Sequence, residues 1–153
     1  MAEQQQQMPM LKVSVLHYRD KSHDEATWTK WYLEEQIPRF IPMAHKHGID
    51  RCELAKKYLM PEAFKQQFQV DLDQLKGGCA AGWNMAPYDA ATIYWVTDPQ
   101  KIRNMLNDPD WNSKVVVFEK GWIDQTKVDV QAGTQTTFIE DGKIVNTITK
   151  EYD

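Results

Sequence analysis

The sequence predicts a single α+β domain, in which an antiparallel four-stranded sheet and two main helices follow a ferredoxin-like order and a β-hairpin ends the chain. Two segments carry this prediction. Residues 86–111 hold a run of β-branched and aromatic residues that closes at an Asp-Pro pair, then a short helical stretch and a second Asp-Pro stop. Residues 11–47 hold an earlier strand and helix, which supply the other half of the unit.

The first half of the chain is predicted to form a strand, a turn and an interrupted helix. Apolar and polar side chains alternate over residues 11–19, and the polar turn at residues 20–24 ends in helix-capping residues. Apolar residues then recur at helical spacing from Glu25 onward. Pro38 predicts a kink or break in this helix, and Gly48 predicts its end.

The second half is predicted to hold further strands, an amphipathic helix and the terminal hairpin. The elements expected there are a strand within Ile49–Tyr58, a helix over Glu62–Lys76, a short helix over Gln100–Leu106, a long strand over 124–139 and a hairpin over 139–145. Gly133 is expected to mark a bulge or bend in the long strand. Residues 114–122 favour a strand by propensity and a helix by spacing, so both alternatives stay open. The Asp-Gly pair at 141–142 fits a hairpin turn with positive φ.

Composition narrows the class of protein. The 153 residues are 42% hydrophobic and include six tryptophans, which is enough for one buried core. The net charge of −4 is spread along the chain, and this argues against nucleic acid or an anionic membrane as partner. Cys52 and Cys79 form no CxxC motif, so neither a disulfide framework nor a metal site is predicted. We expect residues 1–10 to be a flexible arm, residues 11–153 to be one domain, and the protein to be cytoplasmic.

The histidines are the first candidates for proton transfer near neutral pH. His45 and His47 follow the end of the first predicted helix, near one mouth of the sheet. We rank His47 first, then His45, then His17. The alternative for His47 is a structural role at the negative end of the helix dipole. The alternative for His17 is a hydrogen-bonded residue in a dimer interface.

Other candidates are polar or aromatic side chains suited to a small ligand. Asp89 begins a predicted strand, where its carboxylate could accept a substrate hydroxyl or orient a histidine; the alternative is a bond to local backbone amides. The flat faces of the tryptophans suit aromatic ligands as well as core packing, and we expect one or two, including Trp111, to line the pocket.

Several motifs resemble the EthD-domain family of dimeric α/β barrels. They are Val15-Leu16-His17-Tyr18-Arg19, the segment Trp28 to Pro38, Lys46-His47-Gly48-Ile49, Tyr88-Asp89-Ala90 and Asn107-Asp108-Pro109-Asp110-Trp111. The likeness spans roughly residues 11 to 125 and is greatest to fungal members found with polyketide synthase clusters. Many EthD-like proteins carry a histidine just before the proline at the end of the first helix, and this sequence has Gln36 there.

The resemblance implies a homodimer in which a small aromatic polyketide lies between sheet and helices, with no metal or cofactor. Strand positions then place Ser14, Tyr18, Thr92 and Tyr94 on the ligand side. Tyr18 and Tyr94 would stabilise a developing enolate oxygen, and His47 would return a proton to carbon. Gln36 could hydrogen-bond a phenol or carboxyl group but cannot transfer protons at neutral pH, so it suits binding.

The function implied in this way is a cofactor-independent decarboxylase that acts on an aromatic polyketide β-keto acid. The alternatives are a cyclase, a cofactor-free monooxygenase of the same fold, or a non-catalytic protein that binds the polyketide. A dimer is expected on independent grounds as well, because a sheet with helices on one face leaves the other face apolar, as Val13, Val15, Ile93 and Trp95 suggest.

Overall fold

The computed structural model describes residues 10–49, 54–75, 77–78 and 81–145. The expected flexible arm therefore lies, apart from Met10, outside the described residues, as does the beginning of the strand expected within Ile49–Tyr58. Four strands form one sheet, namely β1 (Leu11–Arg19), β2 (Leu54–Leu59), β3 (Ala90–Val96) and β4 (Ile123–Thr134). Their order is β2-β3-β1-β4, and all neighbours are antiparallel. The predicted α+β class and four-stranded antiparallel sheet are confirmed.

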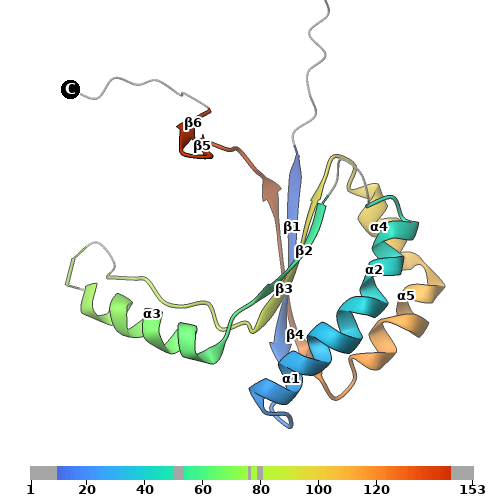
Figure 1. Cartoon of the computed structure of the whole chain (residues 1–153), viewed down its shortest axis with the longest axis horizontal. Coiled ribbons are helices and arrows are strands. Elements are labelled where there is room, and N and C mark those ends of the chain that lie inside the picture. Colours follow the sequence, from blue (N-terminus) through green and yellow to red (C-terminus); the bar gives the residue numbers. More distant parts are fainter. Residues whose placement is uncertain (1–9, 50–53, 76, 79–80, 146–153) are drawn as a thin grey trace, which may run out of the picture.

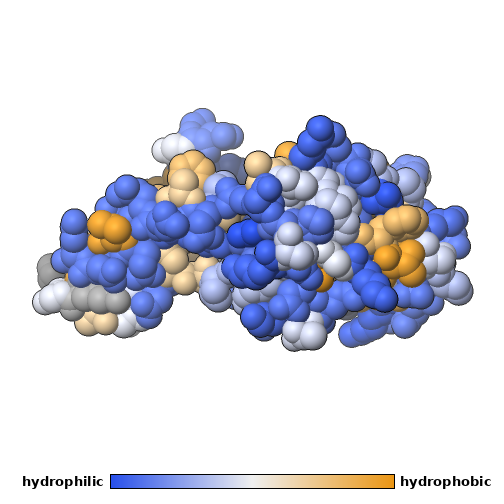
Figure 2. All heavy atoms as spheres, turned by 90° about the horizontal axis from the view of Figure 1, so that it is seen from below, coloured by the Kyte–Doolittle hydropathy of each residue, from blue (hydrophilic) through white to orange (hydrophobic). Residues whose placement is uncertain are grey.

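Most helices cover one face of this sheet (Figure 1). They are α1 (Glu25–Trp31), the π-helix η1 (Tyr32–Gln36), α2 (Ile37–Lys46), α4 (Gln100–Asn107), α5 (Pro109–Lys114) and the 3-10 turn η2 (Val116–Phe118). Helix α3 (Glu62–Leu75) lies on the opposite side and buries none of its residues. Apolar residues such as Phe64 and Phe68 stay exposed on it, and the α3 end of the molecule shows apolar patches among hydrophilic surface (Figure 2).

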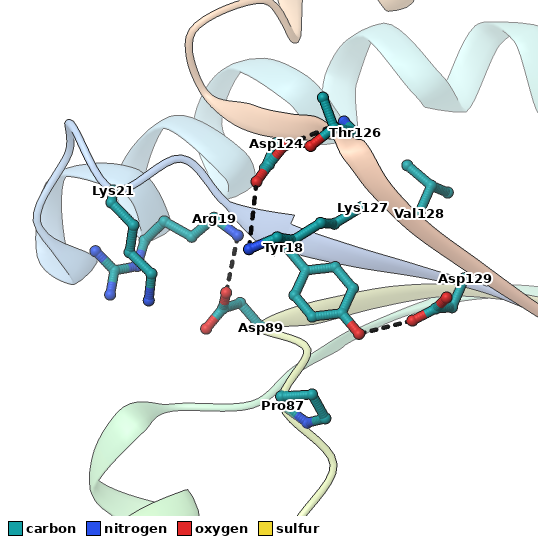
Figure 3. A pocket seen from close by; sticks show the side chains of 10 residues that line it. All are labelled: Tyr18, Arg19, Lys21, Pro87, Asp89, Asp124, Thr126, Lys127, Val128 and Asp129. Atoms are coloured by element: carbon teal, nitrogen blue, oxygen red, sulfur yellow. Dashed lines mark hydrogen bonds and ion pairs between the residues drawn. The ribbon is translucent and has the colours of Figure 1, made fainter.

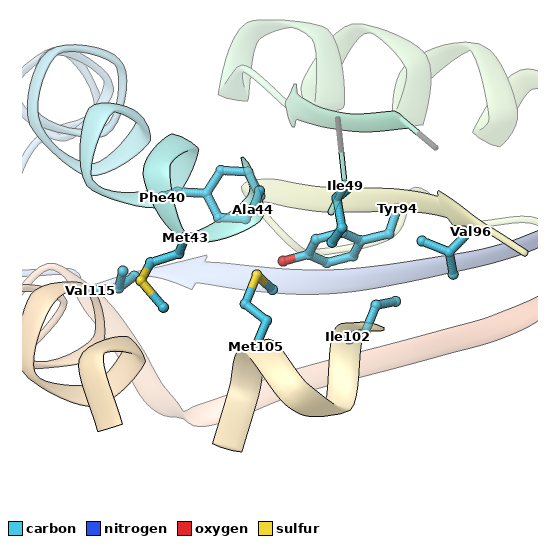
Figure 4. Packing of buried hydrophobic residues seen from close by; sticks show 9 residues of the cluster. All are labelled: Phe40, Met43, Ala44, Ile49, Tyr94, Val96, Ile102, Met105 and Val115. Atoms are coloured by element: carbon cyan, nitrogen blue, oxygen red, sulfur yellow. The ribbon is translucent and has the colours of Figure 1, made fainter. Parts of the chain in front are cut away.

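Two apolar clusters hold the helices on the covered face. In the first, residues of α2, α4 and β3 interlock, with Phe40, Met43 and Met105 against Tyr94 (Figure 4). The second joins Trp28, Trp31 and Tyr32 to the sheet. Across the described residues, no helix is long and apolar enough to cross a membrane.

The helix interruption predicted at Pro38 takes the form of the π-helix η1. Pro38 has no backbone N–H, and its ring would clash with the carbonyl of the residue four positions earlier in a regular helix. The turn just before it is wider, so that the Ile37 N–H donates to the Tyr32 carbonyl, five residues back. The chain then continues as α2 from Ile37 to Lys46.

The C-terminal half corrects two expectations about β4 and settles the open segment. Gly133 forms no bulge, because it pairs in register with Lys12, and the irregularity lies instead between His17 and Arg19. The strand ends at Thr134, before the hairpin begins. Residues 114–122 contain the end of α5 and the turn η2 rather than a strand.

The predicted C-terminal hairpin is confirmed. Strands β5 (Ile139–Glu140) and β6 (Lys143–Ile144) pair with each other, outside the main sheet. The turn residues Asp141 and Gly142 have φ values of 50° and 75°. Both lie in the left-handed region that a type I′ turn requires, which Asp-Gly adopts readily.

The strand register corrects the set of residues expected on the open face. Residues directly opposite in an antiparallel pair share a face, and Val13 pairs with Tyr94 while Val15 pairs with Thr92. Val13 and Val15 therefore pack under the helices, against the first cluster. Ile93 and Trp95 alternate to the other face, so the expectation holds for them alone.

Candidate functional site

A cavity of about 180 Å³ lies between the helix-covered face of the sheet and the helices α2, α4 and α5. Both polar and apolar side chains line this cavity. The polar lining residues are His17, Gln36, Lys57, Thr92 and Glu119, and the apolar and aromatic ones include Phe40, Tyr94, Ile102, Trp111 and Val115. The cavity can therefore hold an apolar ring against one set and polar substituents against the other.

The strand register brings the sheet side of this cavity together. Thr92 on β3 pairs with Val15 on β1 and with Lys57 on β2, so these three side chains form one row across the sheet. His17 lies two residues beyond Val15 and points to the same face. The row places an amine, a hydroxyl and an imidazole under the helices.

Lys57 is a lysine with no carboxylate partner among the described residues. Its Nζ atom donates a short hydrogen bond to the Thr92 hydroxyl. It lies 4.1 Å from the centre of the Phe40 ring and 5.4 Å from that of Tyr32. Burial lowers the pKa of Lys57 to about 7, against an opposing effect of the Glu119 charge. The amine is therefore partly neutral at physiological pH.

Glu119 supplies the acidic group of the cavity. It follows the turn η2, and its Oε1 atom accepts a hydrogen bond of 2.8 Å from Gln36 Nε2. Burial raises the pKa of Glu119 to about 7, although Lys57 and Gln36 both act in the opposite direction. Near neutral pH, both the carboxyl group of Glu119 and the amine of Lys57 are therefore partly protonated.

His17, the candidate ranked third among the histidines, is the one that lines the cavity. Its Nδ1 atom is buried and has no hydrogen-bond partner in the described part of the chain. Burial, helped by the charge of Lys57, lowers the pKa of His17 to about 4. The imidazole is therefore neutral at physiological pH. The alternative of a dimer-interface residue is wrong, because His17 faces the helices.

Four predicted residues do lie at the cavity, namely Gln36, Thr92, Tyr94 and Trp111. Tyr94 is 3% exposed, and burial raises the pKa of its hydroxyl well above the ordinary value. The Phe40 ring lies between Tyr94 and Trp111, with ring centres 5.9 Å and 6.3 Å away. These rings form an aromatic wall.

Ser14 and Tyr18 do not join them, and the expectation that they share a face with Thr92 and Tyr94 is wrong. Ser14 pairs with Ile93, on the opposite face of the sheet. The Tyr18 hydroxyl donates to Asp129 at 2.6 Å in a wide, polar surface hollow (Figure 3). The alternation of both strands was predicted correctly, and so was the helix-covered face of β3, but the face of β1 that the helices cover was not.

His47 and His45 lie outside this cavity, at the end of α2. His47 is the C-terminal cap of that helix, and its Nε2 atom lies 2.8 Å from Asp108 Oδ2. Lys46 Nζ reaches the same carboxylate oxygen at 2.7 Å. His45 is exposed on the last turn. This arrangement corresponds to the structural alternative for His47.

Asp89 also has a structural role, which is the alternative given for it from the sequence. Its carboxylate accepts hydrogen bonds from the Arg19 backbone N–H at 2.8 Å and from Lys65 Nζ at 2.7 Å. The first bond is drawn in Figure 3. Asp89 thereby joins β1, the start of β3 and helix α3, and lies away from the cavity.

Sequence reasoning missed Lys57 and Glu119. Lys57 belongs to a Lys-Lys pair, and lysines are ordinarily exposed. Glu119 lies in the segment left open between strand and helix. A signal for Lys57 existed, because alternation along β2 puts it on the same face as Leu59. Among the described residues, no group of three or more acidic, histidine or cysteine side chains could hold a metal.

Several known proteins are similar to this chain. The family model of the EthD domain matches residues 21–126. A protein named "Dehydratase iacD", from Pestalotiopsis fici, is 26% identical over 140 residues, covering 92% of this chain and 96% of that protein. One named "Putative oxygenase", from Aspergillus terreus, is 24% identical over 138 residues, covering 90% and 81%. The crystal structure of an EthD family protein from Bacillus halodurans, 9% identical, aligns with a TM-score of 0.45 over 83% of this chain and 99% of that one.

Proposed function

The chain belongs to the EthD domain family, and from that premise we propose that it is a cofactor-independent lyase that eliminates water from a compact hydroxylated carbonyl compound. The observation that carries the proposal is the pair of Lys57 and Glu119 at one cavity, each with a pKa of about 7. An elimination needs both a base and an acid near neutral pH. The similarity to a protein named as a dehydratase supports this reaction over the others.

The two groups have complementary tasks in this reaction. The neutral Lys57 amine removes a proton from the carbon next to the substrate carbonyl, and the electron pair left behind forms the new carbon–carbon double bond. The carbon–oxygen bond at the neighbouring carbon breaks, and the Glu119 acid gives its proton to the departing oxygen, which leaves as water. Lys57 ends as an ammonium and Glu119 as a carboxylate, and a proton passed from the first to the second restores both.

The surroundings favour a small substrate with an aromatic ring. The volume of about 180 Å³ lies below the roughly 300–1,000 Å³ of pockets for drug-sized ligands. Phe40, Tyr94 and Trp111 offer ring faces and edges to an aromatic group. Exclusion of water by these rings strengthens the electrostatic effect of Lys57 on a developing enolate oxygen.

Decarboxylation of an aromatic polyketide β-keto acid, the reaction expected from the sequence, is the second candidate. The observation in its favour is that, among the described residues, the Lys57 amine donates a hydrogen bond to Thr92, which leaves further N–H groups for a substrate ketone oxygen. That oxygen gains charge when carbon dioxide leaves. Glu119 would then protonate the enolate carbon. Dehydration ranks first because it uses the base as well as the acid.

One assay separates these reactions. Purified protein is mixed with 4-hydroxy-4-phenylbutan-2-one, whose dehydration gives a conjugated enone that is followed by its ultraviolet absorbance. Parallel reactions measure carbon dioxide release from benzoylacetic acid and oxygen uptake with either compound. We expect enone formation that falls by about 10²–10⁴-fold in both Lys57→Met and Glu119→Gln. The matched control is Tyr18→Phe, on the other face of the sheet, which keeps the wild-type rate.

The other outcomes each contradict the proposal in a defined way. Carbon dioxide release without enone formation would establish the decarboxylase instead. Oxygen uptake would establish the monooxygenase, and binding without any of the three reactions would establish a binding protein. Enone formation that survives in both variants would remove Lys57 and Glu119 from the mechanism.

We also propose that the functional unit is a homodimer formed on the open face of the sheet. Ile93 and Trp95 face that side and are only partly buried, and Tyr58 on β2 is 51% exposed. Apolar surface of this kind is typical of an interface. Light scattering at micromolar concentration tests it, and a monomeric mass would contradict it.

A further inference from the structure

Gln36 is a fully buried polar residue of the cavity, with 2% of its surface exposed. Only half of its amide group is used. The Nε2 atom donates to Glu119 Oε1 at 2.8 Å, whereas the Oε1 atom is buried and has no hydrogen-bond partner in the described part of the chain. A buried acceptor without a partner costs free energy, so such a group is expected to have a partner in the working protein.

The backbone that carries Gln36 is itself unusual. Gln36 is the last residue of the π-helix η1 and stands directly before the helix α2. Single π-helical turns within α-helices are rare and occur frequently at functional sites. This turn accommodates Pro38 and, at the same time, sets the direction in which Gln36 leaves the helix, toward the cavity and Glu119.

The unused atom defines the chemistry of its missing partner. An amide oxygen accepts hydrogen bonds only, so the partner must bring an O–H or N–H group. Glu119, held by the other end of the same amide, is the acid of the proposed elimination. A hydroxyl between the two can donate its hydrogen to Gln36 and offer a lone pair of its oxygen to the acid.

We infer that Gln36 recognises the hydroxyl group that leaves as water, with its Oε1 atom accepting a hydrogen bond from that hydroxyl while its Nε2 atom positions Glu119. This assignment rests on the proposed function. It makes Gln36 the residue that selects hydroxylated over deoxygenated carbonyl compounds, because a ligand without the hydroxyl leaves the buried oxygen unpartnered.

The test measures binding rather than turnover, so that it does not depend on the reaction. Isothermal titration calorimetry gives the Kd of 4-hydroxy-4-phenylbutan-2-one and of 4-phenylbutan-2-one, which lacks only the hydroxyl. The protein is Lys57→Met, in which the hydroxylated ligand persists, compared with the same protein carrying Gln36→Met in addition. We expect the first protein to bind the hydroxylated ligand at least about tenfold more tightly, a difference of about 1.4 kcal/mol.

In the second protein we expect the two Kd values to agree within about twofold, with the affinity for 4-phenylbutan-2-one unchanged. The ligand that lacks the hydroxyl is thus the internal control for folding. If Gln36→Met does not fold, Gln36→Asn shortens the side chain and is expected to give the same loss of preference. A preference that survives either substitution, or its absence from the first protein, would overturn the inference. If wild-type protein forms no enone, the same titrations in wild type decide the role of Gln36 separately from the proposed function.

Discussion

Two groups of charged and polar side chains differ in how far their hydrogen bonds are satisfied. One lies at the end of α2 and the other lines the cavity. At the end of α2, Asp108 accepts from Lys46 at 2.7 Å and from His47 at 2.8 Å, and these bonds hold the pKa of Asp108 well below its usual range. In the cavity, Lys57 contacts a hydroxyl and two rings, and Glu119 contacts an amide.

The difference separates charges with a structural role from those that the proposed function uses. A paired charge at a surface stabilises the fold modestly and leaves no capacity for a ligand. An unpaired charge in a cavity costs stability, because burial disfavours the ionised form, and it persists where chemistry requires it. His47 therefore resembles an active-site histidine by residue type, yet it belongs to the first group.

The largest expected effect is on catalysis. Glu119→Gln should lower kcat/KM for enone formation by about 10²–10⁴-fold, since it removes the acid while keeping the shape of the side chain. His47→Gln should leave kcat/KM within about twofold, because His47 contacts Asp108 rather than the cavity. A larger loss of kcat/KM in His47→Gln than in Glu119→Gln would contradict this distinction between the two groups.

Substitutions in the two groups should also change the stability of the protein in opposite directions. Lys57→Met should raise the free energy of unfolding, because burial disfavours the ionised Lys57 amine and an apolar side chain carries no such cost. His47→Ala should lower the melting temperature, because it removes a bond from Asp108. Thermal unfolding of both variants beside wild type measures the difference, and a lower melting temperature for Lys57→Met would contradict it.

The stabilising effects expected of Lys57→Met and Glu119→Gln should depend on pH in opposite ways. The folded pKa of Lys57, about 7, is below the ordinary lysine value of 10.5, so the cost of burying its charge is full below pH 7 and disappears as pH rises to 10.5. The folded pKa of Glu119, also about 7, is above the ordinary glutamate value of 4.5, so the cost of burying its charge is full above pH 7 and absent below pH 4.5. Lys57→Met should therefore stabilise most at acidic pH and Glu119→Gln most at alkaline pH. Denaturation at pH 5.5 and pH 9 provides the test, and parallel changes would contradict it.

The smallest expected effect concerns the pH profile of activity. The base must be neutral and the acid protonated, so kcat/KM should be bell-shaped with its maximum near pH 7, where both pKa values lie. One pH unit to either side of it should cost roughly tenfold or less. A rate that stays level from pH 5 to pH 9 would show that neither group titrates in the reaction.

The strands β1 and β3 and the hairpin could be predicted from the sequence because alternation and Asp-Gly turns are local signals. The assignment of faces could not, because a period of two says which side chains share a face and not which face the helices cover. Tyr18 and Tyr94 were grouped together for this reason. Thr92, Gln36 and Trp111 do lie at the cavity, whereas the positions of Lys57 and Glu119 there depend on how segments 62 residues apart in the sequence pack together.

The π-helix also makes the packing of the preceding helix sensitive to the length of the chain at this point. Each residue turns a helix by about 100°, so deleting one residue from Tyr32–Gln36 would convert the wide turn to an ordinary one and rotate everything before it. Trp28 and Trp31 would swing away from the sheet while α2 kept its place. The wide turn thus lets Trp28 and Trp31 pack on the sheet while Gln36, at its end, faces the cavity.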